Sequence, residues 1–127
     1  MRHLTPEFAA AAAEVIASGA IGWFQVRSVG GAVADVDPDA TAYPHRAANF
    51  SVMVMGAHDD AVDAAWARLQ PFVDGLYLSF DTRVPAPVAE AWPPATLARL
   101  RDLKAKYDPD AVFRDNFPLT PATRSPR

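Results

Sequence analysis

Proline placement constrains the fold of this chain more than any other feature, because eight of the twelve prolines lie after residue 84. Proline fixes the backbone angle φ and has no N–H to donate, so it interrupts helices and the interior of sheets. Residues 84–94 contain four prolines and are expected to hold no regular structure, with Trp92 anchoring them to the body. We therefore expect residues 1–83 and residues 84–127 to be organised differently within one compact unit.

The composition predicts one small domain and excludes several classes of function. Half of the 127 residues are hydrophobic, but alanine supplies 26 of them, which leaves a thin core. The absence of cysteine excludes disulfides, thiolate catalysis, iron–sulfur clusters and zinc ribbons. The net charge of −3 offers no basic footprint for nucleic acid. No apolar run is long enough to span a membrane, so we expect a cytoplasmic protein that binds neither nucleic acid nor membrane.

The periodicity of apolar residues predicts three helices and three strands. A hydroxyl N-cap before proline marks a helix start at Thr5-Pro6, and Ser18-Gly19 marks its end. A second helix begins at Asp59-Asp60, and a third covers residues 95–107. The order predicts an α+β fold: an antiparallel sheet of about three strands with helices packed on one face, then a Pro-rich loop and a C-terminal helix. The buried face of the first helix is expected to contain Phe8, Ala12, Val15 and Ile16.

Each expected strand carries its own signal. The first covers residues 23–36, where Gly30-Gly31 indicates a bulge or a backbone that another group approaches closely. The second covers residues 49–57 and is apolar on both faces, so it is predicted to be central in the sheet. The third covers residues 76–82 and alternates between an apolar and a polar face. The apolar face contains Leu76, Leu78 and Phe80, and the polar face contains Tyr77, Ser79 and Asp81.

Two patterns that resemble binding motifs fail when their full spacing is considered. Asp35, Asp37 and Asp39 have the spacing that opens a calcium loop, but Ala40 occupies the glycine position and Arg46 the position of the bidentate acid. Gly30-Gly31 lacks the spacing of a dinucleotide fingerprint, and no phosphate-binding lysine follows it. We therefore predict neither a metal site nor a nucleotide-binding loop.

Two polar clusters remain as candidate site residues. Tyr43-Pro44-His45-Arg46 combines an imidazole that can transfer protons with a guanidinium that can hold an anion, although such a pair is also typical of a solvated turn. Tyr77 shares its expected strand face with Ser79, and a tyrosine hydroxyl can act as a general base. The same face fits an ordinary solvent-facing strand equally well. The residues alone therefore supply no complete catalytic set.

Three segments resemble, in the same order, motifs of the berberine bridge enzyme-like FAD-linked oxidases. Residues 30–46 (GGAVADVDPDATAYPHR) resemble the family's Gly-Gly…Thr-x-aromatic-Pro-His-Arg stretch. Residues 76–80 (LYLSF) are similar to its Tyr-hydrophobic-Asn-aromatic strand. Residues 97–117 (LARLRDLKAKYDPDAVFRDNF) are similar to the segment that closes those proteins, where a Leu-rich helix runs into Tyr-Asp-Pro-x-x-hydrophobic-Phe-Arg. The resemblance covers most of the chain.

The resemblance implies an identity for each part of the chain. Residues 1–83 resemble the end of the family's substrate domain, and residues 84–127 resemble its berberine bridge-type C-terminal segment. Family members bind FAD in a large additional domain, commonly through a histidine tether. FAD is thus the implied cofactor, while the main binding domain and the tether are expected to be absent from this chain.

The resemblance also implies roles for single residues. Tyr77 matches a strand tyrosine that deprotonates a substrate hydroxyl, while Ser79 stands where asparagine is expected. Substrate- or flavin-facing roles are implied for Tyr43, His45, Arg46 and Ser79. A structural role is implied for the closing motif, which contains Tyr107, Asp108, Phe113, Arg114 and Asn116.

The leading hypothesis is a C-terminal fragment or subunit of an FAD-dependent oxidoreductase. Such an enzyme transfers hydride from an alcohol, sugar or amine to flavin, and this chain would be inactive without a separate FAD-binding chain as partner. The alternative is a stand-alone α+β module that forms a homodimer and binds a ligand or partner without catalysis, since truncation would expose apolar surface. A third hypothesis is a gene remnant with no selected function.

Overall fold

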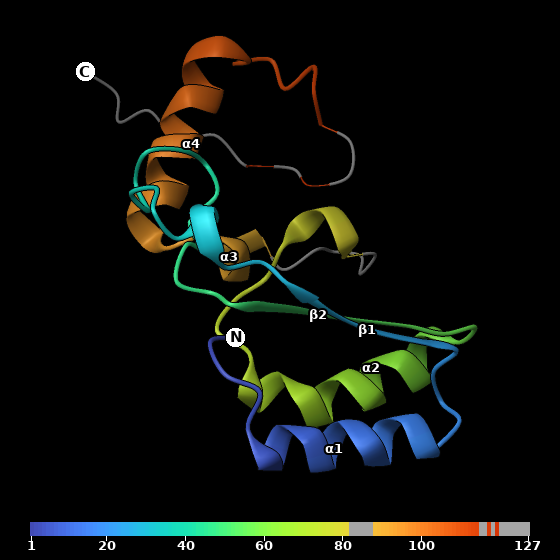
Figure 1. Cartoon of the computed structure of the whole chain (residues 1–127). Coiled ribbons are helices and arrows are strands. Elements are labelled where there is room, and N and C mark those ends of the chain that lie inside the picture. Colours follow the sequence, from blue (N-terminus) through green and yellow to red (C-terminus); the bar gives the residue numbers. More distant parts are fainter. Residues whose placement is uncertain (82–87, 115–116, 118, 120–127) are drawn as a thin grey trace. The chain divides into compact units, whose positions relative to one another are not determined.

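The computed structural model describes residues 1–81, 88–114, 117 and 119, and it divides the chain into two units. Unit 1 comprises Met1–Asp37 and His45–Asp74, and unit 2 comprises Pro38–Pro44 and Gly75–Arg127. Unit 1 contains a two-stranded antiparallel sheet and two helices, so the predicted α+β class is confirmed (Figure 1). The predicted division between residues 83 and 84 stays a prediction.

The first helix, α1, covers Pro6–Ala17 and begins where the sequence predicts. The Thr5 hydroxyl accepts a hydrogen bond from the Phe8 amide at 3.2 Å, and Pro6 occupies the first turn, where no intrahelical N–H is needed. Ser18 caps the end, and Gly19 follows at a positive φ of 69°. One expectation is wrong: Ile16 lies at the rim of the apolar stripe and is 52% exposed.

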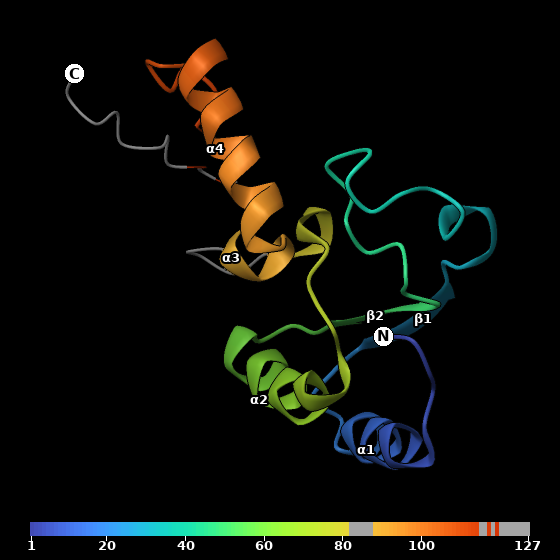
Figure 2. The same cartoon turned by 90° about the vertical axis from the view of Figure 1, so that its left-hand side faces the viewer.

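The sheet pairs β1, Trp23–Ser28, with β2, Phe50–Met55, from Trp23 opposite Met55 to Ser28 opposite Phe50. The second helix, α2, covers Asp59–Leu69 and continues into the 3-10 turn η2, Gln70–Phe72. Helices α1 and α2 both pack on one face of the sheet, as predicted (Figures 1 and 2). The core of unit 1 is formed by the buried side chains of Met1, Phe8, Ala12, Val15, Ala65 and Leu69, and Phe24, Phe50, Val52 and Val54 of the sheet pack against it.

The predicted third strand at residues 76–82 is wrong. Leu78–Phe80 form the 3-10 turn η3, and the described sheet has only the two strands β1 and β2. A 3-10 turn brings residues three apart together, and the rings of Tyr77 and Phe80 lie with centroids 5.6 Å apart. The prediction that β2 is central is also wrong, because within the described residues β2 pairs with β1 alone.

The Gly30-Gly31 pair ends β1 rather than forming a bulge within it. Gly31 has a φ of 68° and opens the 3-10 turn η1, Gly31–Val33. A Cβ on Gly30 would lie 2.9 Å from the Asn49 side-chain oxygen, so the close approach that the sequence predicted is made by Asn49. The side-chain Nδ2 of Asn49 in turn donates to the Arg2 carbonyl at 2.9 Å.

Unit 2 contains two helices in addition to η3. Helix α3 covers Val88–Ala91, a short turn within the segment that was expected to be irregular. Helix α4 covers Pro94–Tyr107, close to the predicted 95–107, and Figure 2 shows α3 leading into it. Pro93 and Pro94 start α4 where a missing N–H costs nothing, and Leu97 is its buried residue. None of the described helices is long and apolar enough to cross a membrane.

Gly56 provides a direct test of packing in unit 1. A Cβ there would lie 2.8 Å from Val62 Cγ2 and 2.9 Å from the Ala20 backbone oxygen, so the backbone itself must move. We expect Gly56→Ala to lower the free energy of unfolding by about 1–3 kcal/mol, measured by urea denaturation. The matched control is Gly22→Ala, where nothing lies within 4 Å of the added Cβ, and its effect should stay within about 0.5 kcal/mol. Equal effects of both variants would contradict this view of Gly56.

Candidate functional site

Three aromatic rings of unit 2 form the aromatic cluster, defined as Tyr43, Tyr77 and Phe80. The Tyr43 ring meets the Tyr77 ring edge to face, with centroids 6.1 Å apart and an interplanar angle of 75°. The Tyr77 ring also contacts the Phe80 ring, with centroids 5.6 Å apart and an interplanar angle of 58°. Tyr77 still exposes 47% of its surface, and Phe80 is half exposed. The cluster therefore presents a tyrosine whose ring is held by two neighbours while part of it faces solvent.

The local chain explains how Tyr77 and Phe80 come together. Turn η3 places them three residues apart on one side, while Leu78 between them is buried. The amide of Phe80 donates to the Tyr77 carbonyl at 3.4 Å, and the amide of Asp81 donates to the Leu78 carbonyl at 2.9 Å. Ser79 is exposed in the same turn, so it does not share a strand face with Tyr77 as predicted.

Tyr43 reaches the cluster from the loop Pro38–Pro44, which belongs to unit 2 although its flanking residues belong to unit 1. Two side chains of unit 2 bind this loop. Trp92 Nε1 donates to the Ala42 carbonyl at 2.7 Å, and Arg99 Nη1 donates to the Asp39 carbonyl at 3.3 Å. The expectation that Trp92 anchors its segment is therefore matched by a specific hydrogen bond.

The remaining residues of the Tyr-Pro-His-Arg stretch lie across the boundary of the two units. Tyr43 and Pro44 belong to unit 2, whereas His45 and Arg46 belong to unit 1, and both are half-buried. Their predicted substrate- or flavin-facing roles stay predictions. The structure brings the rings of Tyr43 and Tyr77 together in the aromatic cluster.

The hollow on unit 1 is too small for a whole FAD molecule. Its volume is about 270 Å³. It falls below the roughly 300–1,000 Å³ typical of small-molecule pockets, and a dinucleotide needs the upper part of that range. The space beside Gly30, where a flat ligand could have fitted, is occupied by the Asn49 side chain. The hollow is lined by Met1, Arg2, His3, Thr5, Phe72 and Asp74.

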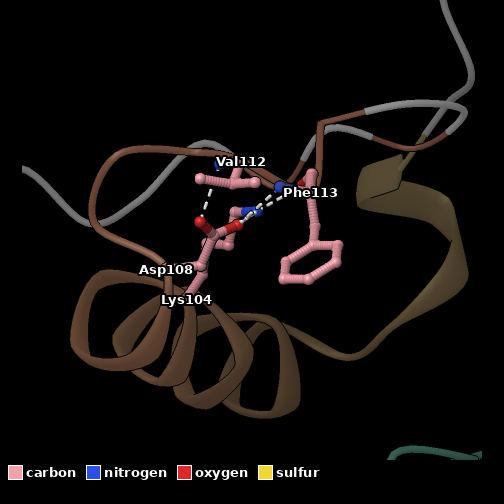
Figure 3. A network of polar contacts seen from close by, with 4 residues as sticks. All are labelled: Lys104, Asp108, Val112 and Phe113. Carbon is pink, nitrogen blue, oxygen red and sulfur yellow. Dashed lines mark hydrogen bonds and ion pairs between the residues drawn. The ribbon is translucent and has the colours of Figure 1, made fainter.

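The closing motif is organised by the Asp108 carboxylate at the end of α4 (Figure 3). Its Oδ1 accepts from the Val112 amide at 2.7 Å, and its Oδ2 accepts from the Phe113 amide at 3.1 Å and from Lys104 Nζ. Lys104 Nζ also donates to the Phe113 carbonyl. The carboxylate and the ammonium thus fold residues 108–113 back as a closed turn. The role that the resemblance implies for Asp108 stays a prediction.

The turn closed by Asp108 presents apolar side chains to solvent. Phe113 is 84% exposed, and Tyr107 and Val112 are also largely exposed. We call Tyr107, Val112 and Phe113 the C-terminal apolar patch. Arg114 is exposed, and Asn116 lies outside the described residues. Sequence reasoning missed Lys104, although its position four residues before Asp108 on α4 is the spacing at which such pairs meet.

The carboxylate of Asp108 predicts a pH dependence of the turn. The hydrogen bond from Lys104 lowers the pKa of Asp108 below its ordinary 3.8, the amides of Val112 and Phe113 lower it further, and desolvation opposes them. A lowered pKa means that the turn gains stability from Asp108 above the unfolded-state pKa and loses it as the pH falls through the folded-state pKa. We expect the amide resonances of Val112 and Phe113 to titrate with a midpoint below 3.8, measured by NMR.

The control for this titration is Asp108→Asn, which has no carboxylate to protonate and should remove the step. A midpoint at or above 3.8 in the unmodified chain would contradict the assignment of Asp108 as the acceptor that closes the turn.

Comparisons with known proteins agree with these segments. Residues 88–118 match the family model described as "Berberine and berberine like". The chain is 28% identical over 106 residues to "FAD-linked oxidoreductase alt4" of Alternaria solani, covering 68% of this chain and 22% of that protein. It is 31% identical over 94 residues to "Uncharacterized FAD-linked oxidoreductase YvdP" of Bacillus subtilis (strain 168), covering 67% of this chain and 21% of that protein.

These matches confirm the predicted resemblance. The chain carries a berberine-like segment that includes α3, α4 and the closed turn after it, and it is similar to FAD-linked oxidoreductases. It spans about a fifth of the length of the curated relatives it matches.

Proposed function

We propose that this chain, with its berberine-like segment, supplies the substrate-facing part of an FAD-linked oxidoreductase whose FAD-binding part is a separate protein domain. The observation that carries the proposal is the aromatic cluster, in which the half-exposed Tyr77 is held between Tyr43 and Phe80. The proposed reaction is the FAD-dependent oxidation of an alcohol, a sugar or an amine. Without the FAD-binding domain, this chain is expected to be inactive.

Tyr77 is the residue that we assign to proton transfer. In the deprotonated form, its phenolate oxygen takes the proton from a substrate hydroxyl and becomes the phenol, while the neighbouring rings limit how the side chain can turn. The edge-to-face contact with Tyr43 fixes one side of the ring, and the exposed side remains for the substrate. His45 and Arg46 are assigned to orient an anionic or polar part of the substrate.

The FAD-binding domain is proposed as a partner because the relatives that match this chain are FAD-linked oxidoreductases and extend far beyond the aligned segment. FAD, when bound in that domain, supplies the redox chemistry of the reaction. The relatives with matching segments are about five times longer than the aligned part, which leaves ample chain for a cofactor domain.

The C-terminal apolar patch is the proposed contact surface for that domain. Its Phe113 is 84% exposed but sits on a turn closed by four hydrogen bonds around Asp108 and Lys104. A rigid, exposed aromatic residue loses little conformational freedom on binding, and such residues dominate the energy of protein interfaces.

Co-purification tests the proposal. The tagged full chain is expressed together with a candidate FAD-binding domain, and the visible flavin absorbance of the purified complex is recorded. We expect a yellow complex, with binding at least tenfold weaker for Phe113→Ala and unchanged for Met55→Ala, which removes a half-exposed apolar side chain from unit 1. A colourless chain that binds no such protein would overturn the proposal.

The alternative function is a homodimeric module that binds a ligand without catalysis. The exposed Tyr107, Val112 and Phe113 also favour this alternative, because an apolar surface of this kind is suited to a second copy of the chain. Light scattering on the purified chain distinguishes the two: a stable dimer supports the module, and a monomer that dimerises at no tested concentration rules it out.

A further inference from the structure

We propose that Trp92 is a positioning residue of the aromatic cluster, and that Arg99 assists it. Both side chains hold the loop Pro38–Pro44 by its backbone, and this loop delivers Tyr43 to Tyr77. The catalytic meaning of the inference rests on the proposed function of Tyr77, whereas the geometry does not depend on it.

The two hydrogen bonds around Ala42 and Tyr43 fix a single peptide plane. The Ala42 carbonyl and the Tyr43 amide belong to the same peptide group, which is planar and rigid. Trp92 Nε1 donates to that carbonyl at 2.7 Å, and the Tyr43 amide donates to the Thr41 hydroxyl oxygen at 3.2 Å. With both sides of the plane bound, the Tyr43 ring can be moved mainly by its own side-chain rotations.

The position of Trp92 is itself well determined. It follows Ala91, which is buried at the end of α3, and it precedes Pro93 and Pro94, which start α4. Proline restricts the backbone of the residue before it as well as its own. The backbone that carries the indole is therefore restricted, and the hydrogen bond to the Ala42 carbonyl places the indole N–H itself.

Arg99 adds a second, weaker attachment to the same loop. It lies in α4, and its Nη1 donates to the Asp39 carbonyl at 3.3 Å, near the long end of the hydrogen-bond range. The two donors bind the loop at residues three apart, so they resist rotation of the loop as well as its translation.

Both donors lie within residues 88–118, the part of the chain that matches the berberine-like family model. The aromatic cluster contains no residue from that segment. We infer that the segment acts on Tyr77 indirectly, through the loop that carries Tyr43. A substrate that reaches Tyr77 would then contact the Tyr43 ring, whose position depends on Trp92 and Arg99.

The experiment is NMR on the isotopically labelled full chain, without flavin or substrate. In the unmodified chain we expect ring-proton cross-peaks for the Tyr43–Tyr77 pair and for the Tyr77–Phe80 pair. In Trp92→Phe, which keeps an aromatic ring but has no N–H to donate, we expect the first set to fall at least threefold in intensity while the second set is retained. The matched control is Trp23→Phe on the exposed end of β1, which should change neither set.

Retention of the Tyr43–Tyr77 cross-peaks at full intensity in Trp92→Phe would overturn the proposal. If that variant fails to fold, two further measurements decide. Arg99→Gln should weaken the same cross-peaks by a smaller factor, and the indole N–H of Trp92 should exchange with solvent at least tenfold more slowly than that of Trp23. An Arg99→Gln spectrum identical to that of the unmodified chain, together with equal exchange of the two indoles, would also overturn it. Because no flavin is present, failure of the proposed function leaves this result unaffected.

Discussion

Tyr77→Phe is expected to lower kcat by about 10²–10⁴-fold in the complex of this chain with its FAD-binding partner. The substitution removes the hydroxyl that we assign to proton transfer, and loss of a positioned general base typically costs a factor of this size. The ring itself remains, so its edge-to-face contact with Tyr43 and its contact with Phe80 should persist. The measurement is steady-state oxidation of the identified alcohol or sugar substrate, with kcat and KM determined separately.

The matched control for this prediction is Tyr107→Phe, since Tyr107 is the tyrosine that lies outside the aromatic cluster. Because Tyr107 belongs to the C-terminal apolar patch, both variants are assayed with the FAD-binding partner in saturating excess. It is largely exposed at the end of α4, and removal of its hydroxyl should leave kcat within about twofold. A Tyr77→Phe enzyme with unchanged kcat would eliminate Tyr77 as the base. A rise in KM with unchanged kcat would instead assign Tyr77 to substrate binding.

Leu69→Ala is expected to lower the free energy of unfolding of unit 1 by about 3 kcal/mol. Leu69 is 0% exposed at the end of α2, within the core that joins α1, α2 and the sheet. Substitution removes the transfer free energy of the deleted methyl groups and leaves a cavity, which together cost about 2–5 kcal/mol for a buried leucine. A small domain of marginal stability can lose most of its folded population through such a change. Urea denaturation followed by far-ultraviolet circular dichroism measures it.

Ile16→Ala provides the control for Leu69→Ala. It deletes a branched aliphatic side chain from α1 of the same unit, but Ile16 is 52% exposed, so we expect a loss below about 1 kcal/mol. If the two variants unfolded at the same urea concentration, the assignment of Leu69 to the centre of the core would be wrong.

The parts of the fold that could be predicted from sequence are those that local chemistry specifies. Thr5-Pro6 marked the start of α1 because a hydroxyl cap and a proline act within one turn of chain. The extent of α4 followed from the helical spacing of its apolar residues. The sequence could predict that another group approaches Gly30 closely. It could not identify that group as Asn49, because Asn49 is distant in the sequence and comes directly before β2.

The alternation of apolar and polar residues at 76–82 predicted a strand wrongly. Such a pattern shows which side chains could share a face, but it does not show whether a neighbouring strand is present to pair with. The short aromatic spacing between Tyr77 and Phe80 fits a 3-10 turn equally well. Tyr77 and Tyr43 could be named from sequence through the family resemblance. Their mutual contact could not be predicted, because no local pattern links residues so far apart in the sequence. The same holds for the hydrogen bonds from Trp92 and Arg99 to the loop, which join residues 50 and 60 positions apart.

The interleaving of the two units has a consequence for the order in which the chain folds. Closing a loop of 50 or 60 residues costs conformational entropy that contacts within a hairpin or a helix do not pay. Helix α2 and the β1–β2 pair can form from nearer neighbours in sequence, so they should acquire protection against hydrogen exchange first. The loop Pro38–Pro44 can gain both of its side-chain attachments only after Trp92 and Arg99 have emerged. During synthesis, the ring environment of Tyr43 is therefore expected to mature last, when residue 99 has left the ribosome.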